Sequence, residues 1–137
     1  MLKINILNVP EEEVEKLLKK YDGGKDTFEL FLNIGRDYMK KYKTKPVDIN
    51  SKEGQEEVRR IMFALIEELM EFANTLKNKK WCNSDYPVDE QHMLEELADA
   101  WAFWIQLLLL LDFNKDNFKR LYISKLIVNE FRLRSEY

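Results

Sequence analysis

The sequence predicts an all-α fold, a bundle of four to five helices that forms a single domain over residues 1–137. Three observations carry this prediction. The chain contains only four glycines and three prolines, so long helices are favoured over many short strands. Apolar residues recur every three or four positions, and no segment shows the alternation of a half-buried strand. With 45% hydrophobic and 34% charged residues, the composition is that of a globular domain large enough for a core.

The N-terminal part predicts two helices. The segment "EEEVEKLLKK" (residues 11–20) follows Pro10, a residue favoured in a first helical turn, and precedes a pair of glycines that stops it. A second helix is expected over residues 26–42, because Asp26 and Glu29 have the spacing of a capping box. Its apolar stripe consists of Phe31, Ile34 and Tyr38.

Three further helices are predicted after the basic segment "KKYKTKPVDINS" (residues 40–51), which is interpreted as a solvated loop. They span about residues 51–78, 88–112 and 115–134. The first of these has a sustained 3.6-residue pattern. Its apolar residues are Ile61, Met62, Leu65, Ile66, Leu69, Phe72, Ala73 and Leu76.

The run "AWAFWIQLLLLL" (residues 100–111) is apolar except for Gln106. As a helix it is about 18 Å long, whereas a bilayer core requires roughly 30 Å. Asp99 and Asp112 bracket it. We therefore expect no membrane contact and a helix buried on nearly all sides. A small monomeric bundle could not cover so much apolar surface, which predicts a homodimer or higher homo-oligomer.

Charge and cysteine content exclude several classes of function. The net charge of −3 argues against binding of a nucleic acid polymer, which normally needs a basic surface. The single cysteine, Cys82, excludes an intrachain disulfide and a cysteine-built zinc site. The N-terminal apolar run is too short for a secretory signal, so a cytoplasmic protein is expected.

Two pairs of acidic residues predict a metal site. Glu68 and Glu71 are three residues apart, as are Glu96 and Asp99, so each pair lies on one helical face. If the two helices pack antiparallel the pairs converge, and four close carboxylates require a compensating charge. Oxygen ligands suit Mg²⁺, or Mn²⁺ as an alternative. His92, one turn before Glu96, is expected to orient a carboxylate rather than bind metal.

The competing interpretations are surface acids on ordinary helices and a di-iron centre. Glu-x-x-Glu pairs are frequent on exposed helices, although here both pairs border apolar faces. A ferritin-like di-iron centre uses Glu-x-x-His on each of two helices, and the chain has one histidine. The sequence therefore favours the carboxylate site.

These segments resemble a known family. "EELMEFANTLKNKKW" followed by "EELADAWAF" is similar to the Glu-Glu-x-x-Glu…Glu-x-x-Asp signature of the all-α nucleoside triphosphate pyrophosphohydrolases, the MazG-like superfamily. Within it, Asn74, Lys80 and Trp81 look most like the dimeric dUTPase branch. "YISKLIVNEFRLRSEY" also resembles that branch's Tyr-x-x-Lys-x-x-x-Asn-x-x-Arg pattern with its closing tyrosine, and the likeness covers residues 60–137. The matching positions are Tyr122, Lys125, Asn129, Arg132 and Tyr137.

The resemblance implies Mg²⁺-dependent hydrolysis of a deoxynucleoside triphosphate, with dUTP as the expected substrate, to the monophosphate and pyrophosphate. A dCTP or broad-specificity pyrophosphatase is the alternative, and a helical interaction module is the alternative outside enzymes. The resemblance places metal ligands at Glu68, Glu71, Glu96 and Asp99. It adds Glu67 as an auxiliary carboxylate, and we expect Glu71 or Glu67 to act as the general base. It places substrate contacts at Lys80, Trp81, Tyr122, Lys125, Asn129 and Arg132.

The N-terminal third departs from the family pattern. Related dUTPases present a glutamine amide to uracil from an early helix, whereas "FELFLNIGRDY" contains no glutamine. Asn33 is the nearest amide and becomes the candidate for reading the base. Trp81 either stacks on the base or caps the core.

Overall fold

The computed structural model describes residues 12, 16, 19–20, 26–77, 79–81 and 87–135. Within them the chain forms α2 (Thr27–Lys41), α3 (Lys52–Thr75), α4 (Glu90–Leu110) and α5 (Lys115–Arg134), and no strand. The all-α prediction is therefore confirmed. The predicted first helix, residues 11–20, lies mostly outside the described residues.

Each helix begins at a polar side chain that accepts hydrogen bonds from the first turn. The Asp26 carboxylate accepts from the backbone N–H groups of Phe28 and Glu29, which confirms the predicted start of α2. Ser51, Asp89 and Asn114 occupy the same position in α3, α4 and α5. α3 ends at Thr75, three residues before the predicted end at residue 78, and α4 ends at Leu110.

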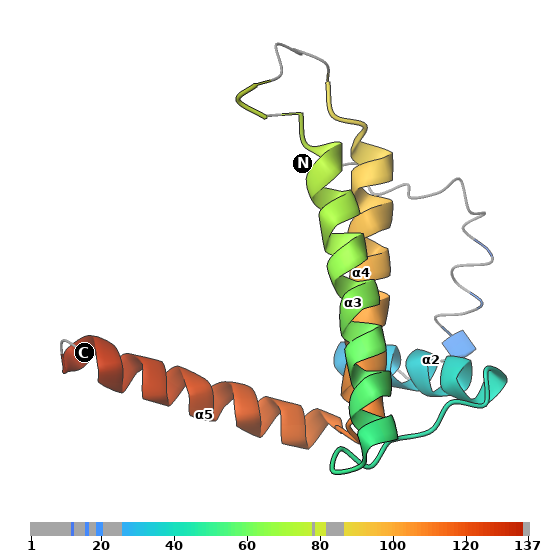
Figure 1. The fold of residues 1–137 in the computed structure, drawn as a ribbon, viewed down its shortest axis with the longest axis vertical. Coiled ribbons are helices and arrows are strands. Elements are labelled where there is room, and N and C mark those ends of the chain that lie inside the picture. The colour runs from blue at the N-terminus through green and yellow to red at the C-terminus, as the bar shows by residue number, and fades with distance from the viewer. Residues whose placement is uncertain are drawn as a thin grey trace.

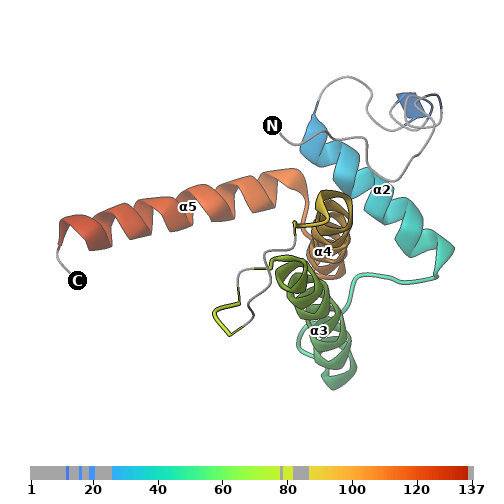
Figure 2. The ribbon, with the colours of Figure 1, turned by 90° about the horizontal axis from the view of Figure 1, so that it is seen from above.

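α3 and α4 form a long antiparallel pair, as Figure 1 shows. α2 crosses the end of this pair and contacts α4, and α5 leads away from it (Figures 1 and 2). Among the described helices, α5 contacts α2 alone. The described part of the chain thus forms a body of α2, α3 and α4 from which α5 projects.

The core lies where α2 meets the end of the α3–α4 pair. Its buried residues are Leu32, Met39, Ile61, Ile105, Leu107, Leu108, Leu109 and Leu110. Gly35 allows the close crossing, because a Cβ there would lie 2.7 Å from Leu109 Cδ1 and 2.9 Å from Ile105 Cγ2. The loop before α3 is tied to the same end by a hydrogen bond of 2.9 Å from Val47 N–H to the Leu110 carbonyl.

Two expectations about apolar faces were wrong in part. Of the predicted stripe of α2, Phe31 is half-buried and packs against the core, whereas Tyr38 is largely exposed. The buried residues of α2 are instead Leu30, Leu32 and Met39. In α3 only Ile61 of the predicted apolar set is buried. The face that carries Met62, Ile66 and Leu69 is exposed, since no described helix covers it.

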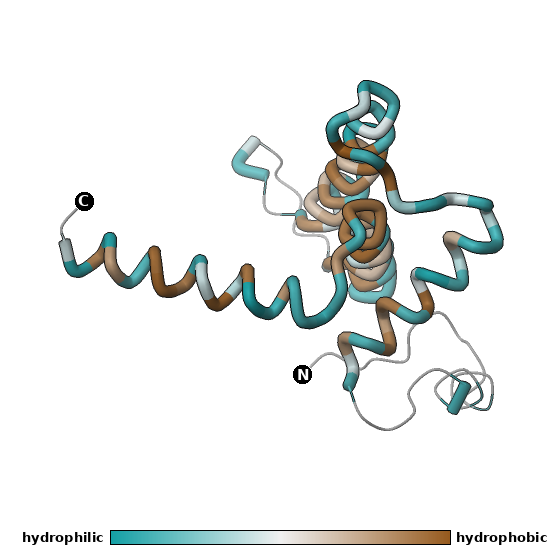
Figure 3. Tube along the Cα trace, turned by 90° about the horizontal axis from the view of Figure 1, so that it is seen from below, coloured by the Kyte–Doolittle hydropathy of each residue, from teal (hydrophilic) through white to brown (hydrophobic). Residues whose placement is uncertain are grey.

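The premise that residues 100–111 exceed what one chain can cover is also wrong for the second half of this run. Ile105 and residues 107–110 are buried within the chain. Most of the exposed large hydrophobic side chains lie on α3 and along α5, where hydrophobic residues follow the projecting helix in Figure 3. α5 has no buried residue at all. Among the described residues, no helix combines the length and apolar character needed to cross a membrane.

Candidate functional site

Three acidic side chains come together between α3 and α4. Glu68 from α3 and Glu96 and Asp99 from α4 each place one carboxylate oxygen within 4.8 Å of the others. The antiparallel pairing brings Glu68 opposite the turn that carries the other two, which lie on one face at a spacing of three residues. Such a group of oxygens matches the ligand type that Mg²⁺ and Mn²⁺ prefer.

The surroundings of this cluster disfavour uncompensated negative charge. Glu96 is only 7% exposed, and His92 Nδ1 lies 3.2 Å from its Oε1, in the orienting position expected from the sequence. Partial burial raises the pKa of Glu68, and the neighbouring charges of Asp99, Glu71 and Glu96 raise it further. All the charges that act on Glu68 are thus negative. A bound cation would relieve both effects.

Glu71 and Glu67 lie beside the cluster rather than within it. Both are exposed on α3, and neither contributes an oxygen to the group of three. Glu71 is nevertheless close enough to raise the pKa of Glu68. One turn further along, the buried Thr75 donates its hydroxyl to the Phe72 carbonyl at 2.7 Å, so this hydroxyl serves the helix. The structure therefore groups three of the four predicted ligands and leaves the fourth at the rim.

The predicted contacts on α5 do not approach the carboxylates within one chain. Tyr122, Lys125, Asn129 and Arg132 are all exposed, and α5 contacts only α2 among the described helices. Figure 1 shows α5 leaving the α3–α4 pair at its lower end. One chain by itself therefore does not bring its basic C-terminal helix to its acidic site. Tyr137 lies outside the described residues.

The segment after α3 is likewise open. Trp81 is 81% exposed, so it does not cap the core of this chain, and the exposed Lys80 lies next to it. Lys79 Nζ donates a hydrogen bond of 3.1 Å to the side-chain oxygen of Asn74. The amide of the dUTPase-like segment is therefore already hydrogen-bonded. Cys82 falls outside the described residues.

The Asn33 side chain is engaged in a hydrogen bond within α2. Its side-chain oxygen accepts a hydrogen bond of 2.8 Å from Arg36, whose guanidinium also pairs with Glu29 at 3.0 Å. Glu29 thus bonds to Arg36 rather than closing the capping box proposed from the sequence. Asn33 does not line the cavity next to the carboxylates.

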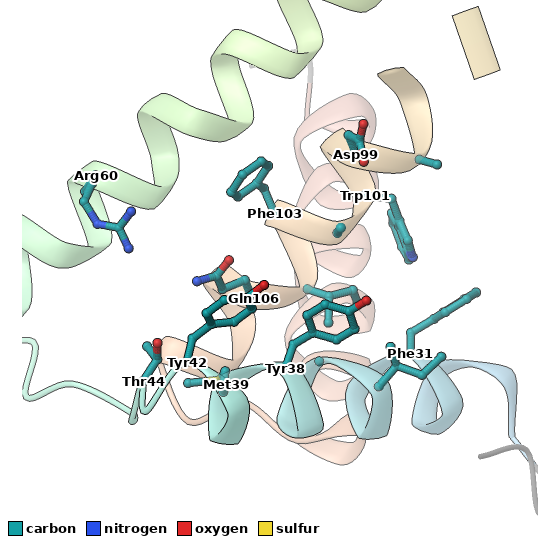
Figure 4. A pocket seen from close by; sticks show the side chains of 15 residues that line it. Phe31, Tyr38, Met39, Tyr42, Thr44, Arg60, Asp99, Trp101, Phe103 and Gln106 are labelled. Atoms are coloured by element: carbon teal, nitrogen blue, oxygen red, sulfur yellow. The ribbon is translucent and has the colours of Figure 1, made fainter. Parts of the chain in front are cut away.

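A cavity of about 760 Å³ adjoins the carboxylate cluster and shares Asp99 with it. It lies between α2, α4 and the start of α3 (Figure 4). Its aromatic lining consists of Phe31, Tyr38, Tyr42, Trp101 and Phe103. Its polar lining includes Thr44, Arg60, Asp99 and Gln106. The stripe of α2 that the sequence assigned to the core therefore forms a wall of this cavity.

Sequence reasoning missed Arg60 and Gln106 as candidate site residues. Gln106 was noticed only as the single polar residue of the apolar run, and that interruption was the available signal. Arg60 gave no signal, because an arginine near the start of an amphipathic helix is ordinary surface.

Comparison of the chain with family models, with curated proteins and with solved structures finds no significant match.

Proposed function

We propose that this protein hydrolyses a deoxynucleoside triphosphate, with dUTP as the preferred substrate, to the monophosphate and pyrophosphate. The observation that carries the proposal is the group of Glu68, Glu96 and Asp99 beside a cavity large enough for a nucleoside. The resemblance of residues 60–137 to the all-α pyrophosphohydrolases supports the reaction type. An acidic cluster alone is common on helices, whereas its contact with an aromatic-lined cavity is not explained by surface charge.

The cluster residues fit Mg²⁺ by chemistry, because they offer hard oxygen ligands and excess negative charge. When bound, the metal would neutralise triphosphate charge and activate a water. In the proposed reaction, the oxygen of a water would bond to the α-phosphorus, the bond from that phosphorus to the bridging oxygen would break, and pyrophosphate would leave. A carboxylate would accept the water's proton. Glu71 and Glu67, exposed at the rim of the cluster, are the candidates for this role.

We propose further that the protein acts as a homodimer or larger homo-oligomer, in which α5 of one copy covers the acidic region of another. Charge complementarity supports this arrangement, since α5 carries six basic and two acidic residues in "KDNFKRLYISKLIVNEFRLR". Large exposed hydrophobic side chains on the same helix would be covered as well. These are Leu121, Tyr122, Ile123, Leu126, Ile127, Val128, Phe131 and Leu133. Lys125, Asn129 and Arg132 would then meet the triphosphate across the interface.

A helical interaction module is the second candidate, and the exposed apolar and basic surface of α5 favours it. In that case the acidic cluster would be surface charge without catalytic use. A dCTP-preferring or broad-specificity pyrophosphatase remains the alternative within enzymes. A cytoplasmic location, where deoxynucleotides are pooled, belongs to the same proposal.

The deciding experiment measures pyrophosphate release from dUTP, dCTP, dTTP and dATP, with Mg²⁺, with Mn²⁺ and with a chelator. Metal-dependent release from dUTP is expected, and Asp99→Asn should lose it. Glu53→Gln is the matched control, because Glu53 is exposed in the first turn of α3, far along the helix from the cluster. Absence of release from every nucleotide by the folded protein would support the interaction module.

A further inference from the structure

The cavity next to Asp99 differs at its two ends. Near Asp99 it adjoins the carboxylate cluster. Two turns along α4 its lining includes Gln106, and Arg60 reaches toward it from α3 (Figure 4). Aromatic side chains of α2 and α4 line the space around them. An acidic end, aromatic walls and a far end with hydrogen-bonding groups match the three parts of a nucleotide.

The spacing of these groups fits the length of a nucleotide. Gln106 follows Asp99 by seven residues, a rise of about 10 Å along the helix. Arg60 precedes Glu68 by eight residues on the antiparallel α3, so both polar groups lie on the same side of the cluster. This distance is comparable with the span from an α-phosphate to the far edge of a pyrimidine. A deoxynucleoside whose phosphates lie at the carboxylates would extend its base toward Gln106.

The side-chain amides of Asn33 and Gln106 differ in their hydrogen bonding. The Asn33 oxygen is occupied by Arg36, as described above. The Gln106 amide forms no hydrogen bond with any residue in the described part of the chain, and it is half-buried in the cavity wall. A half-buried amide with unused donor and acceptor groups is available to a ligand.

Arg60 supplies a donor at the same end. Its Nε and one terminal nitrogen donate to the two Glu57 carboxylate oxygens at 2.7 and 2.6 Å, and this pair orients the largely exposed guanidinium. The remaining terminal nitrogen has no hydrogen-bond partner among the residues that the structure describes. An arginine can only donate hydrogen bonds, so whatever faces this nitrogen must accept.

From this geometry we infer that the cavity binds the deoxynucleoside, and that Gln106 and Arg60 select a base with a carbonyl rather than an amino group at C4, uracil over cytosine. The inference rests on the proposed function. A free glutamine amide can rotate to pair with either base, because each offers one donor and one acceptor side by side. The arginine donor distinguishes them. It pairs with the O4 carbonyl of uracil and meets the amino group of cytosine, which leaves unpaired donors facing each other.

The test compares kcat/KM for dUTP and dCTP, together with calorimetric binding of dUMP and dCMP, which does not depend on turnover. The unaltered protein should prefer the uracil nucleotides by about tenfold or more in both measurements. Gln106→Ala should weaken binding of both bases by about tenfold, the loss of one hydrogen-bonded edge. Arg60→Gln should instead bring the ratio close to one, since an amide can accept from cytosine. Asn33→Ala is the matched control, and its ratio should stay unchanged.

The outcomes separate the two proposals. If no nucleotide yields pyrophosphate but dUMP binding shows the expected ratios, the proposed reaction fails and the base site stands. If pyrophosphate is released while Arg60→Gln keeps the ratio of the unaltered protein within about twofold and Gln106→Ala keeps its affinity for both nucleotides, each variant with an unchanged thermal midpoint, the inference is overturned. Equal affinities of dUMP and dCMP for the unaltered protein overturn it as well. If Gln106→Ala loses its thermal transition, the isosteric Gln106→Glu replaces it. The introduced carboxylate should repel the uracil carbonyl and weaken binding of uracil nucleotides.

Discussion

The α3–α4 pair and α5 are helices of similar length with opposite surroundings. α3 and α4 pack along each other and concentrate acidic side chains at Glu68, Glu96 and Asp99. α5 contacts only α2 among the described helices, has no fully buried residue and carries mostly basic charge. Under the proposed function, the chain would thereby separate the acidic half of a phosphate site from its basic half. Packing within one chain brings together the acidic cluster only.

The largest expected effect tests the α3–α4 side of this comparison. Asp99→Asn and Glu96→Gln should each reduce kcat/KM by more than about 100-fold at saturating Mg²⁺, because an amide keeps the shape and removes ligand charge. Glu71→Gln, at the rim, should lower kcat as well if this carboxylate takes the water's proton. Pyrophosphate release and far-ultraviolet circular dichroism are measured together. Near-normal turnover of a folded Asp99→Asn variant would show that the cluster is not the metal site.

The next effect tests whether α5 serves a second copy. Arg132→Ala should reduce kcat/KM by about tenfold or more, the loss of a charge-assisted phosphate contact. Mixing subunits that carry Arg132→Ala with subunits that carry Asp99→Asn should restore part of the activity, because one mixed site then has both groups. The pair of substitutions in one chain is the matched control and should stay inactive when mixed with itself.

The proposed oligomer should depend on the apolar side chains of α5. Phe131→Asp, at a side chain that is 70% exposed in the single chain, should dissociate the oligomer, since a charge would be buried in the interface. Light scattering over a range of micromolar concentrations measures the mass. A stable monomer of the unaltered protein at those concentrations contradicts the oligomer, and full activity of that monomer contradicts the role of α5 in trans.

Local signals in the sequence, such as N-cap residues, predicted the helices better than the apolar patterns predicted which helix faces are buried. Asp26, Ser51 and Asn114 start their helices as their side-chain chemistry indicates, because a cap depends on the next few residues alone. The side to which a helix turns depends on its partners. Phe31 therefore looks like a core residue in the sequence yet lines the cavity, while Leu32 is fully buried.

The candidate site also has a part that residue spacing predicted and a part that depends on tertiary contacts. The spacing of Glu96 and Asp99 fixes their common face, and antiparallel packing of the two long helices adds Glu68. Which amide is available to a ligand depends on side-chain partners that no spacing encodes. Arg36 donates to the Asn33 oxygen, whereas Gln106 lines the cavity and has no hydrogen-bond partner among the described residues.

A smaller effect is expected at the imidazole that orients the cluster. His92 Nδ1 lies 3.2 Å from Glu96 Oε1, and removing it leaves a nearly buried carboxylate without its partner. His92→Ala should raise the Mg²⁺ concentration needed for half-maximal activity by about tenfold, the size expected for a group that positions a ligand, while kcat at saturating metal changes little. His92→Asn, which can still donate a hydrogen bond, should recover part of the loss. An unchanged metal requirement in His92→Ala would assign the contact to structure alone.

The smallest effect concerns stability without metal. Partial burial and three neighbouring acids raise the pKa of Glu68, so the folded state holds this proton more tightly than the unfolded chain does. The contribution of Glu68 to stability is therefore most favourable at pH values below the ordinary pKa of a glutamate, and it is lost as pH rises through the raised pKa.

Glu68→Gln removes this penalty and should raise the thermal midpoint of the metal-free protein at pH 7 by a few degrees. The gain should vanish in acid, where Glu68 is protonated in both states. Added Mg²⁺ should raise the midpoint of the unaltered protein at pH 7 and leave that of Glu68→Gln nearly unchanged, because the variant has lost a ligand. Thermal melts at pH 4 and pH 7, with Mg²⁺ and with a chelator, separate these contributions. A lower midpoint for the metal-free variant at pH 7 would mean that Glu68 stabilises the α3–α4 pair through contacts other than charge, and that the cluster is not under electrostatic strain.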